Sequence, residues 1–150
     1  MPENATELSP NLFDLSDDAW EASILKPGIY DATVVNSRVS SKSSMTWLVI
    51  AYEVMDENGH VRQLDELSAF DAPDSSPRYY ETAKGKGRVR AILKANGKPL
   101  AFSSVDQVPA ALIGCRVSVV VGSRTQDGLR VPIVDSIRGP ASETGTRANP

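Results

Sequence analysis

The sequence SPRYYETAKGKGRVRAILKANGK, residues 76–98, separates two groups of β-patterned segments. Three apolar residues recur in it at the spacing of one helix face: Val89, Ile92 and Leu93. Gly97 follows the periodic stretch, where a glycine commonly ends a helix. The segment therefore predicts a short helix that opens at Gly87 and ends at Gly97.

Three β-patterned runs precede this helix, at residues 30–34, 45–55 and 60–67. In the second run the even positions form a continuous apolar face, which is typical of a strand packed on a core. The turn before the third run contains Asn58-Gly59, a pair that often supplies the positive φ values of a hairpin. Residues 37–44 are polar and predict a loop between the first two strands.

Two further β-patterned runs, residues 116–121 and 129–133, follow a second helical turn that Ser104 caps and Gly114 stops. Asp127-Gly128 turns the chain between them. Pro132 has no N–H to donate, so we expect it at the open side of the sheet or at a bulge. Three strands, a helix and two strands is the order of a five-stranded OB-fold Greek-key barrel, and the sequence predicts this all-β fold.

The barrel is expected to span residues 26–138, with a polar extension at each end. Residues 1–25 form an acidic arm, in which Asn11-Leu12-Phe13 and Trp20 could pack on the barrel. Residues 139–150 offer nothing to bury and are predicted to be disordered.

A reducing compartment is expected from the cysteine content. The single cysteine, Cys115, excludes an internal disulfide and begins an apolar run, so we place it in the core. No signal peptide opens the chain, and no apolar run approaches the ~18 residues of a membrane span. The sequence therefore predicts a cytoplasmic protein that does not enter a membrane.

Charge is unevenly distributed along the chain of 150 residues, whose formal net charge is −3. Residues 1–27 carry six acidic side chains and one lysine, whereas residues 76–98 carry seven basic side chains and one glutamate. Such a local field can steer an anion even when the whole protein is acidic. The basic segment is therefore the first candidate for a binding surface.

Aromatic and basic residues together favour single-stranded nucleic acid, because cations contact phosphates and flat rings stack on bases. Trp47 is expected on the outer face of the second strand, although it could instead lie in a satellite core under the arm. Gly85 and Gly87 would let the backbone approach a phosphate. The loops between strands one and two and between strands four and five would add Arg38, Lys42 and Arg124. The candidate contacts are Arg38, Lys42, Trp47, Arg78, Tyr79, Tyr80, Lys84, Lys86, Arg88, Arg90, Lys94 and Arg124.

An enzymatic role is weakly supported. The one histidine, His60, follows a hairpin turn, and one His with one Cys makes a structural zinc site untenable. Residues 84–87 lack the spacing of a phosphate-binding P-loop. Four carboxylates could hold Mg²⁺ in a nuclease, but their spacing does not fit: Asp65, Glu66, Asp71 and Asp74. We expect no enzyme, no cofactor and no metal.

Several short motifs resemble a family of small bacteriophage proteins. They are Pro27-Gly28-Ile29-Tyr30, the run from Leu48 to Val54, Lys86-Gly87-Arg88, the run from Ile92 to Gly97, and that from Leu112 to Val117. Asn11-Leu12-Phe13-Asp14 is similar to an element of the family's acidic arm. The resemblance implies an OB-fold single-stranded-DNA-binding protein, acting in phage recombination or replication in the host cytoplasm. It supplies no catalytic residues.

The partners expected from this resemblance are single-stranded DNA, a phage recombinase or replication protein, and further copies of the chain in a homo-oligomer. Two other classes of function stay open. One is a protein-interaction module whose basic face docks an acidic partner. The other is a phage assembly or structural protein that uses the small barrel as a scaffold.

Overall fold

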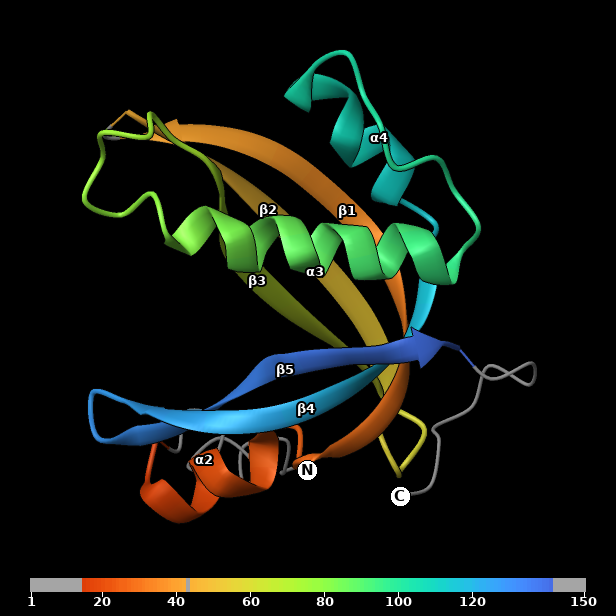
Figure 1. Cartoon of the computed structure of the whole chain (residues 1–150). Coiled ribbons are helices and arrows are strands. Elements are labelled where there is room, and N and C mark those ends of the chain that lie inside the picture. The colour runs from red at the N-terminus through yellow and green to blue at the C-terminus, as the bar shows by residue number, and fades with distance from the viewer. Residues whose placement is uncertain (1–14, 43, 142–150) are drawn as a thin grey trace, which may run out of the picture.

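Five antiparallel strands form one strongly curved sheet, in the order β3-β2-β1-β4-β5 (Figure 1). The computed structural model describes residues 15–42 and 44–141. The strands are β1 (Gly28–Lys42), β2 (Met45–Met55), β3 (Val61–Asp71), β4 (Arg116–Gln126) and β5 (Leu129–Pro140). The helical elements are α2 (Asp17–Ser23), α3 (Glu81–Ala95), a 3-10 turn η2 (Val105–Gln107) and α4 (Val108–Leu112).

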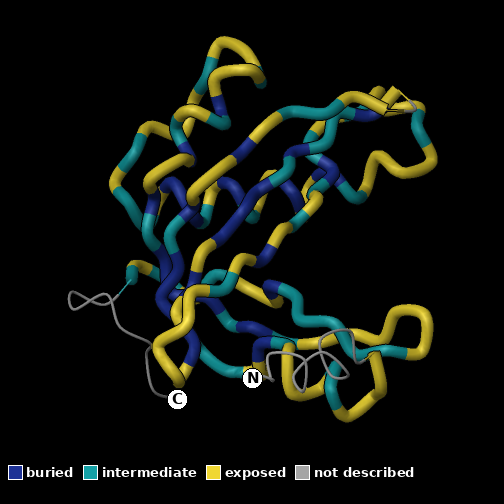
Figure 2. The backbone as a smooth tube through the Cα atoms, turned by 180° about the vertical axis from the view of Figure 1, so that it is seen from behind, coloured by how far each residue is buried: buried dark blue, intermediate teal, exposed yellow. Residues whose placement is uncertain are grey.

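The core fills the inside of this curved sheet. The alternation predicted for β2 is confirmed, since its even positions are buried: Leu48, Ile50, Tyr52 and Val54. Val89, Ile92 and Leu93 cover them from α3, as the helix spacing predicts. Hairpin tips and connecting loops are exposed (Figure 2). Cys115 is buried in this core, as expected, and burial raises the pKa of its thiol.

The open side of the barrel lies between β3 and β5, the two edge strands, and α3 lies across it. Among the described residues, β3 and β5 are not paired by backbone hydrogen bonds. Arg88 of α3 instead bonds to both, with Nε donating to Glu66 of β3 at 2.9 Å and Nη2 to the Val134 carbonyl of β5 at 3.1 Å. The predicted all-β, partly open barrel with its helix between the third and fourth strands is confirmed.

Turn chemistry was predicted well in two places and partly in a third. Gly97 has φ of 64°, and the N–H groups of Gly97 and Lys98 close the end of α3 on the carbonyls of Lys94 and Leu93. Asp127 and Gly128 both have positive φ between β4 and β5. In the β2–β3 hairpin, however, only Gly59 and not Asn58 has positive φ, so the expectation for that pair is half right.

Several predicted boundaries are wrong. Residues 37–42 belong to β1 and pair with β2, so the first hairpin loop is far shorter than expected. Helix α3 begins at Glu81, six residues before Gly87, and it includes Gly85, which packs on β3. Gly139 and Pro140 belong to β5, so the C-terminal extension begins later than residue 139.

Helix α2 anchors the N-terminal arm to the barrel, as expected for Trp20. The indole Nε1 donates to the Arg130 carbonyl of β5 at 2.6 Å, and Glu21 pairs with the Arg130 guanidinium. The other predicted anchors, Asn11-Leu12-Phe13, lie outside the described residues, as do residues 142–150. No helix in the described part of the chain has the length and apolar character needed to cross a membrane.

Candidate nucleic-acid interface

An aromatic and basic surface lies on the outer face of β1, β2 and β3. Arg38 pairs with Val49 and Val49 with Leu67, in one row across the three strands. The next row contains Trp47 between Ser40 and Ala69. Paired residues share a face, so these side chains form one surface. We call it the sheet-face patch: Arg38, Lys42, Trp47, Val49, Leu67 and Arg78.

The patch is partly open to solvent and apolar at its centre. Leu67 is 60% exposed, and Trp47 is half-buried. Arg38 and Lys42 are exposed on β1, each two residues along the strand from Ser40, which pairs with Trp47. The structure therefore corrects the position of Arg38, which was predicted in a loop and instead lies within β1.

Arg78 places its guanidinium over the Trp47 ring, 5.0 Å from the ring centroid. Two hydrogen bonds to Glu81, at 2.7 and 2.9 Å, fix the orientation of the guanidinium. The same hydrogen bonds hold the pKa of the Glu81 carboxyl below its usual range. A cation over an exposed indole contributes about 0.5–1 kcal/mol. Trp47 and Arg78, predicted separately, thus form one stacked unit.

The loop of residues 72–80 brings Arg78 to this position. Asp71 at the end of β3 pairs with Thr46 at the start of β2, so the loop leaves the sheet beside Trp47. Ser76 accepts a hydrogen bond from the Arg78 N–H and holds the loop backbone there. Tyr79 and Tyr80 follow, 42% and 75% exposed, in the last positions before α3. Both residues are therefore exposed next to Arg78 in the sequence.

Arg88 does not belong to the surface where the sequence placed it. Its side chain is 10% exposed and pairs with Glu66, which also accepts from the Tyr52 hydroxyl at 2.7 Å. Burial raises the pKa of that hydroxyl far above its usual value, so Tyr52 remains a donor. Arg88 therefore joins α3 to both edge strands and has a structural role.

Gly85 also has a structural role. A Cβ built on Gly85 would lie 1.9 Å from the Ala69 carbonyl oxygen, so the helix packs directly on the β3 backbone. The space expected for a phosphate is filled by β3. Gly87 is exposed on the same helix, and nothing lies within 4 Å of a Cβ built there.

The remaining basic residues of α3 lie on the other side of β3. The Cβ of Ser68 faces Gly85 of α3, so the neighbouring Leu67 and Ala69 point away from the helix, toward the sheet-face patch. The predicted basic segment is thereby divided between two surfaces. The α3 side carries the exposed Lys84, Lys86, Arg90 and Lys94.

Arg124 lies apart from both of these surfaces in the fold. It belongs to β4, not to the β4–β5 turn as predicted, and its guanidinium donates to Gln126 at 3.2 Å. The turn itself is only Asp127-Gly128, because the two strands pair as far as Gln126 and Leu129.

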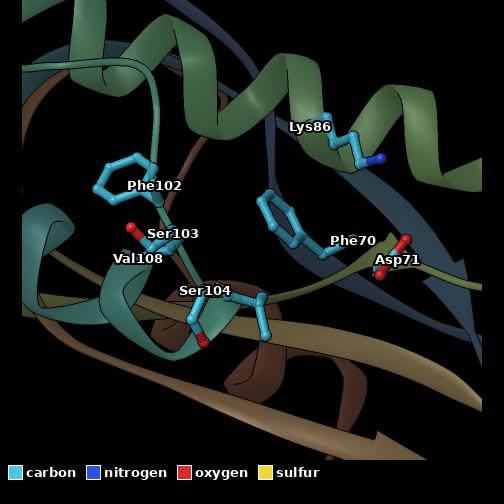
Figure 3. Close-up of a pocket in the computed structure, with 8 residues that line it drawn as sticks. Phe70, Asp71, Lys86, Phe102, Ser103, Ser104 and Val108 are labelled. Atoms are coloured by element: carbon cyan, nitrogen blue, oxygen red, sulfur yellow. The ribbon is translucent and has the colours of Figure 1, made fainter.

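A groove that sequence reasoning missed runs between α3 and residues 98–108 (Figure 3). It consists of two adjoining hollows of about 290 and 270 Å³ that share Phe70, Lys86 and Phe102. Lys86 projects from α3 on one side, and Phe102 comes from the segment after the helix. We call it the helix groove. Phe70 was placed in a connection rather than a strand, which hid its role in the groove wall.

The histidine and the carboxylates singled out in the sequence lie in the described part of the chain. Across residues 15–42 and 44–141 there is no group of three or more His, Cys, Asp and Glu side chains that could hold a metal ion. The His60 side chain is 70% exposed beside Asp56, as expected for a hairpin turn. Of the carboxylates considered for a nuclease, Glu66 is held by Arg88.

Comparisons with protein-family models and with curated proteins identify no relative. No family model matches the chain, and no curated protein matches it. Functional inference therefore rests on the two surfaces described above.

Proposed function

We propose that this protein binds single-stranded DNA on the sheet-face patch, largely without regard to sequence. The observation that carries the proposal is the Trp47–Arg78 stack on the outer face of an OB-type barrel, with Arg38 and Lys42 beside it. OB folds commonly bind oligonucleotides on the face that includes the second and third strands.

The patch supplies both interactions that single-strand binding needs. A base can stack on the Arg78 and Trp47 planes, and Tyr79 and Tyr80 offer further rings at the edge. Arg38 and Lys42 can neutralise phosphates, whereas the charge of Arg78 is already paired with Glu81. Every base has a flat face and every nucleotide a phosphate, so these contacts do not depend on base identity.

The test is binding of a fluorescently labelled oligo-dT by anisotropy, in wild-type protein and in Trp47→Ala. Loss of one stacked base costs about 1–3 kcal/mol, so we expect affinity to fall about 5- to 150-fold. With two phosphates neutralised, the log–log salt slope should be about −1.4, at about −0.7 per phosphate.

Trp20→Phe is the matched control, because Trp20 lies on α2 against β5 and outside the patch. It should leave affinity unchanged and isolate the fluorescence of Trp47, which should be quenched by the oligonucleotide. Equal affinity of Trp47→Ala and wild type would refute the proposed site. No binding even at low salt would refute DNA binding itself.

The proposal does not include catalysis. The role in phage recombination or replication implied by the family resemblance stays a prediction, as does assembly into a homo-oligomer. The patch is proposed to act as a passive binding surface, with no cofactor.

A further inference from the structure

We propose that the helix groove binds an acidic peptide segment of a partner protein, whose apolar side chains enter the two hollows. This site goes beyond the proposed function and does not depend on it. It uses residues of α3 and residues 98–108, whereas the sheet-face patch lies on the other side of β3.

The floor of the groove is apolar and accessible. Val89 and Leu93 of α3 and Leu100 line the hollow of about 270 Å³, with Phe70 and Phe102. Leu100 is 48% exposed, although it is a large aliphatic side chain. Each hollow falls just below the ~300 Å³ at which small-molecule sites usually begin. That size suits apolar side chains of a peptide better than a whole cofactor.

Cations line one side of this floor. Lys86, Arg90 and Lys94 are exposed at four-residue intervals along α3, and the first two line the hollows. No carboxylate of the described residues lies within 4.0 Å of these three, whereas Arg78, Arg88 and Arg130 are each paired with a glutamate. A row of cations about 12 Å long, from 1.5 Å of rise per residue, is therefore available to an acidic partner.

Nucleic acid fits this groove less well than a peptide. Base stacking needs several ring faces, whereas the only rings that the described residues place on the floor are Phe70 and Phe102, which pack against the core, and the other apolar side chains that line it are aliphatic. Asp71 also lines the first hollow and would repel any anionic group there, so the anionic groups of an occupant must lie on the cations of α3 (Figure 3). A peptide can instead place apolar side chains on the floor and carboxylates on Lys86 and Arg90.

The experiment measures anisotropy of a fluorescein-labelled synthetic peptide of alternating glutamate and leucine. Lys86→Glu and Lys84→Glu are a matched pair, since both lysines are exposed on α3 but only Lys86 lines the hollows. We expect saturable binding to wild type, at least about a fivefold loss of affinity in Lys86→Glu, and less than about a twofold loss in Lys84→Glu.

Two control peptides separate the contributions of charge and apolar contact. Replacing the glutamates by lysines, or the leucines by serines, should abolish binding. Absence of saturable peptide binding at low salt overturns the proposal. An equal loss of peptide affinity in Lys86→Glu and Lys84→Glu also overturns it, because it would indicate a general electrostatic attraction to α3 rather than binding in the groove.

The oligo-dT used for the sheet-face patch distinguishes the failure of each site. Lys86→Glu should retain most of its oligo-dT affinity, and Trp47→Ala should bind the peptide as wild type does. If oligo-dT displaces the peptide and Lys86→Glu weakens both ligands equally, the groove belongs to a nucleic-acid path and the peptide proposal is wrong. Loss of oligo-dT binding alone would leave the peptide site standing.

Discussion

Replacing Gly85 by alanine should destabilise the protein, although alanine is the better helix former. The added Cβ would lie 1.9 Å from the Ala69 carbonyl oxygen, well inside the 3.0 Å that real Cβ contacts keep. The obstacle is backbone in the β2–β3 ladder, where Ala69 pairs with Trp47. Helix α3 must therefore retreat from β3 by about an ångström, which also stretches the Arg88–Glu66 ion pair.

The magnitude follows from two opposing effects. Overpacking a well-filled site costs about 1–3 kcal/mol, and occasionally more. Alanine in place of glycine within a helix stabilises the folded protein by about 1 kcal/mol through its higher helix propensity. Because the contact is so short and the neighbour is backbone, we place the cost at the top of its range and expect a net loss of about 2 kcal/mol.

Gly87→Ala is the control within the same helix, because nothing lies within 4 Å of its added Cβ. It should gain about 0.5–1 kcal/mol from helix propensity alone. Urea unfolding followed by circular dichroism measures both variants. A Gly85→Ala protein as stable as wild type would refute the close approach of α3 to β3. If Gly85→Ala instead lost only oligo-dT affinity, the glycine would serve a phosphate after all.

Two further variants test the structural roles assigned to charged residues. Arg88→Met leaves Glu66 with only the Tyr52 hydroxyl as a partner, so the free energy of unfolding should fall by about 2–4 kcal/mol. The oligo-dT affinity of the folded protein should stay within about twofold of wild type. A variant as stable as wild type that has lost oligo-dT affinity would show that Arg88 belongs to the binding surface. The pKa of Asp56 is lowered chiefly by the His60 N–H, then by Arg62 and the Asn58 N–H. The ionised Asp56 carboxylate therefore stabilises the folded protein fully above the unfolded-state pKa of about 4. This stabilisation is lost as pH falls through the lower pKa of the folded protein. Asp56→Asn should be less stable than wild type at pH 7, and the difference should shrink below about pH 4 in acid titrations followed by fluorescence; a difference independent of pH would contradict this.

The order of elements could be predicted because each depends on local pattern. The period of two in β2, the glycine after α3 and the Asp127-Gly128 turn are all decided by residues close together in sequence. The length of β1 could not be predicted, since five of the six residues 37–42 are polar. They form a strand because β2 supplies their backbone hydrogen bonds, while their side chains include exposed ones such as Arg38. Tertiary pairing overrides a weak local preference here.

The candidate site was harder to predict, because the role of a cation depends on a partner distant in sequence. Arg88 and Glu66 are 22 residues apart, and nothing in the basic run distinguishes Arg88 from Arg90. In the structure one is nearly buried in an ion pair and the other is exposed beside an apolar groove. Similarly, Gly85 and Gly87 look alike in sequence, but only Gly85 contacts β3.

Acidic side chains on the same sheet face also explain how a protein of net charge −3 could hold an anionic strand. Beyond the rows of Trp47 and Val49, the next two rows carry Asp65 opposite Ala51, and Glu53 opposite Gln63. Both acids are exposed, so phosphates are repelled from that end of β2 and attracted to the Arg38 and Lys42 end. The gradient along β2 would confine a bound strand to the β1–β2 hairpin, where the Trp47–Arg78 stack lies. In the proposed function, the surface charge pattern, rather than the net charge, therefore determines where DNA binds.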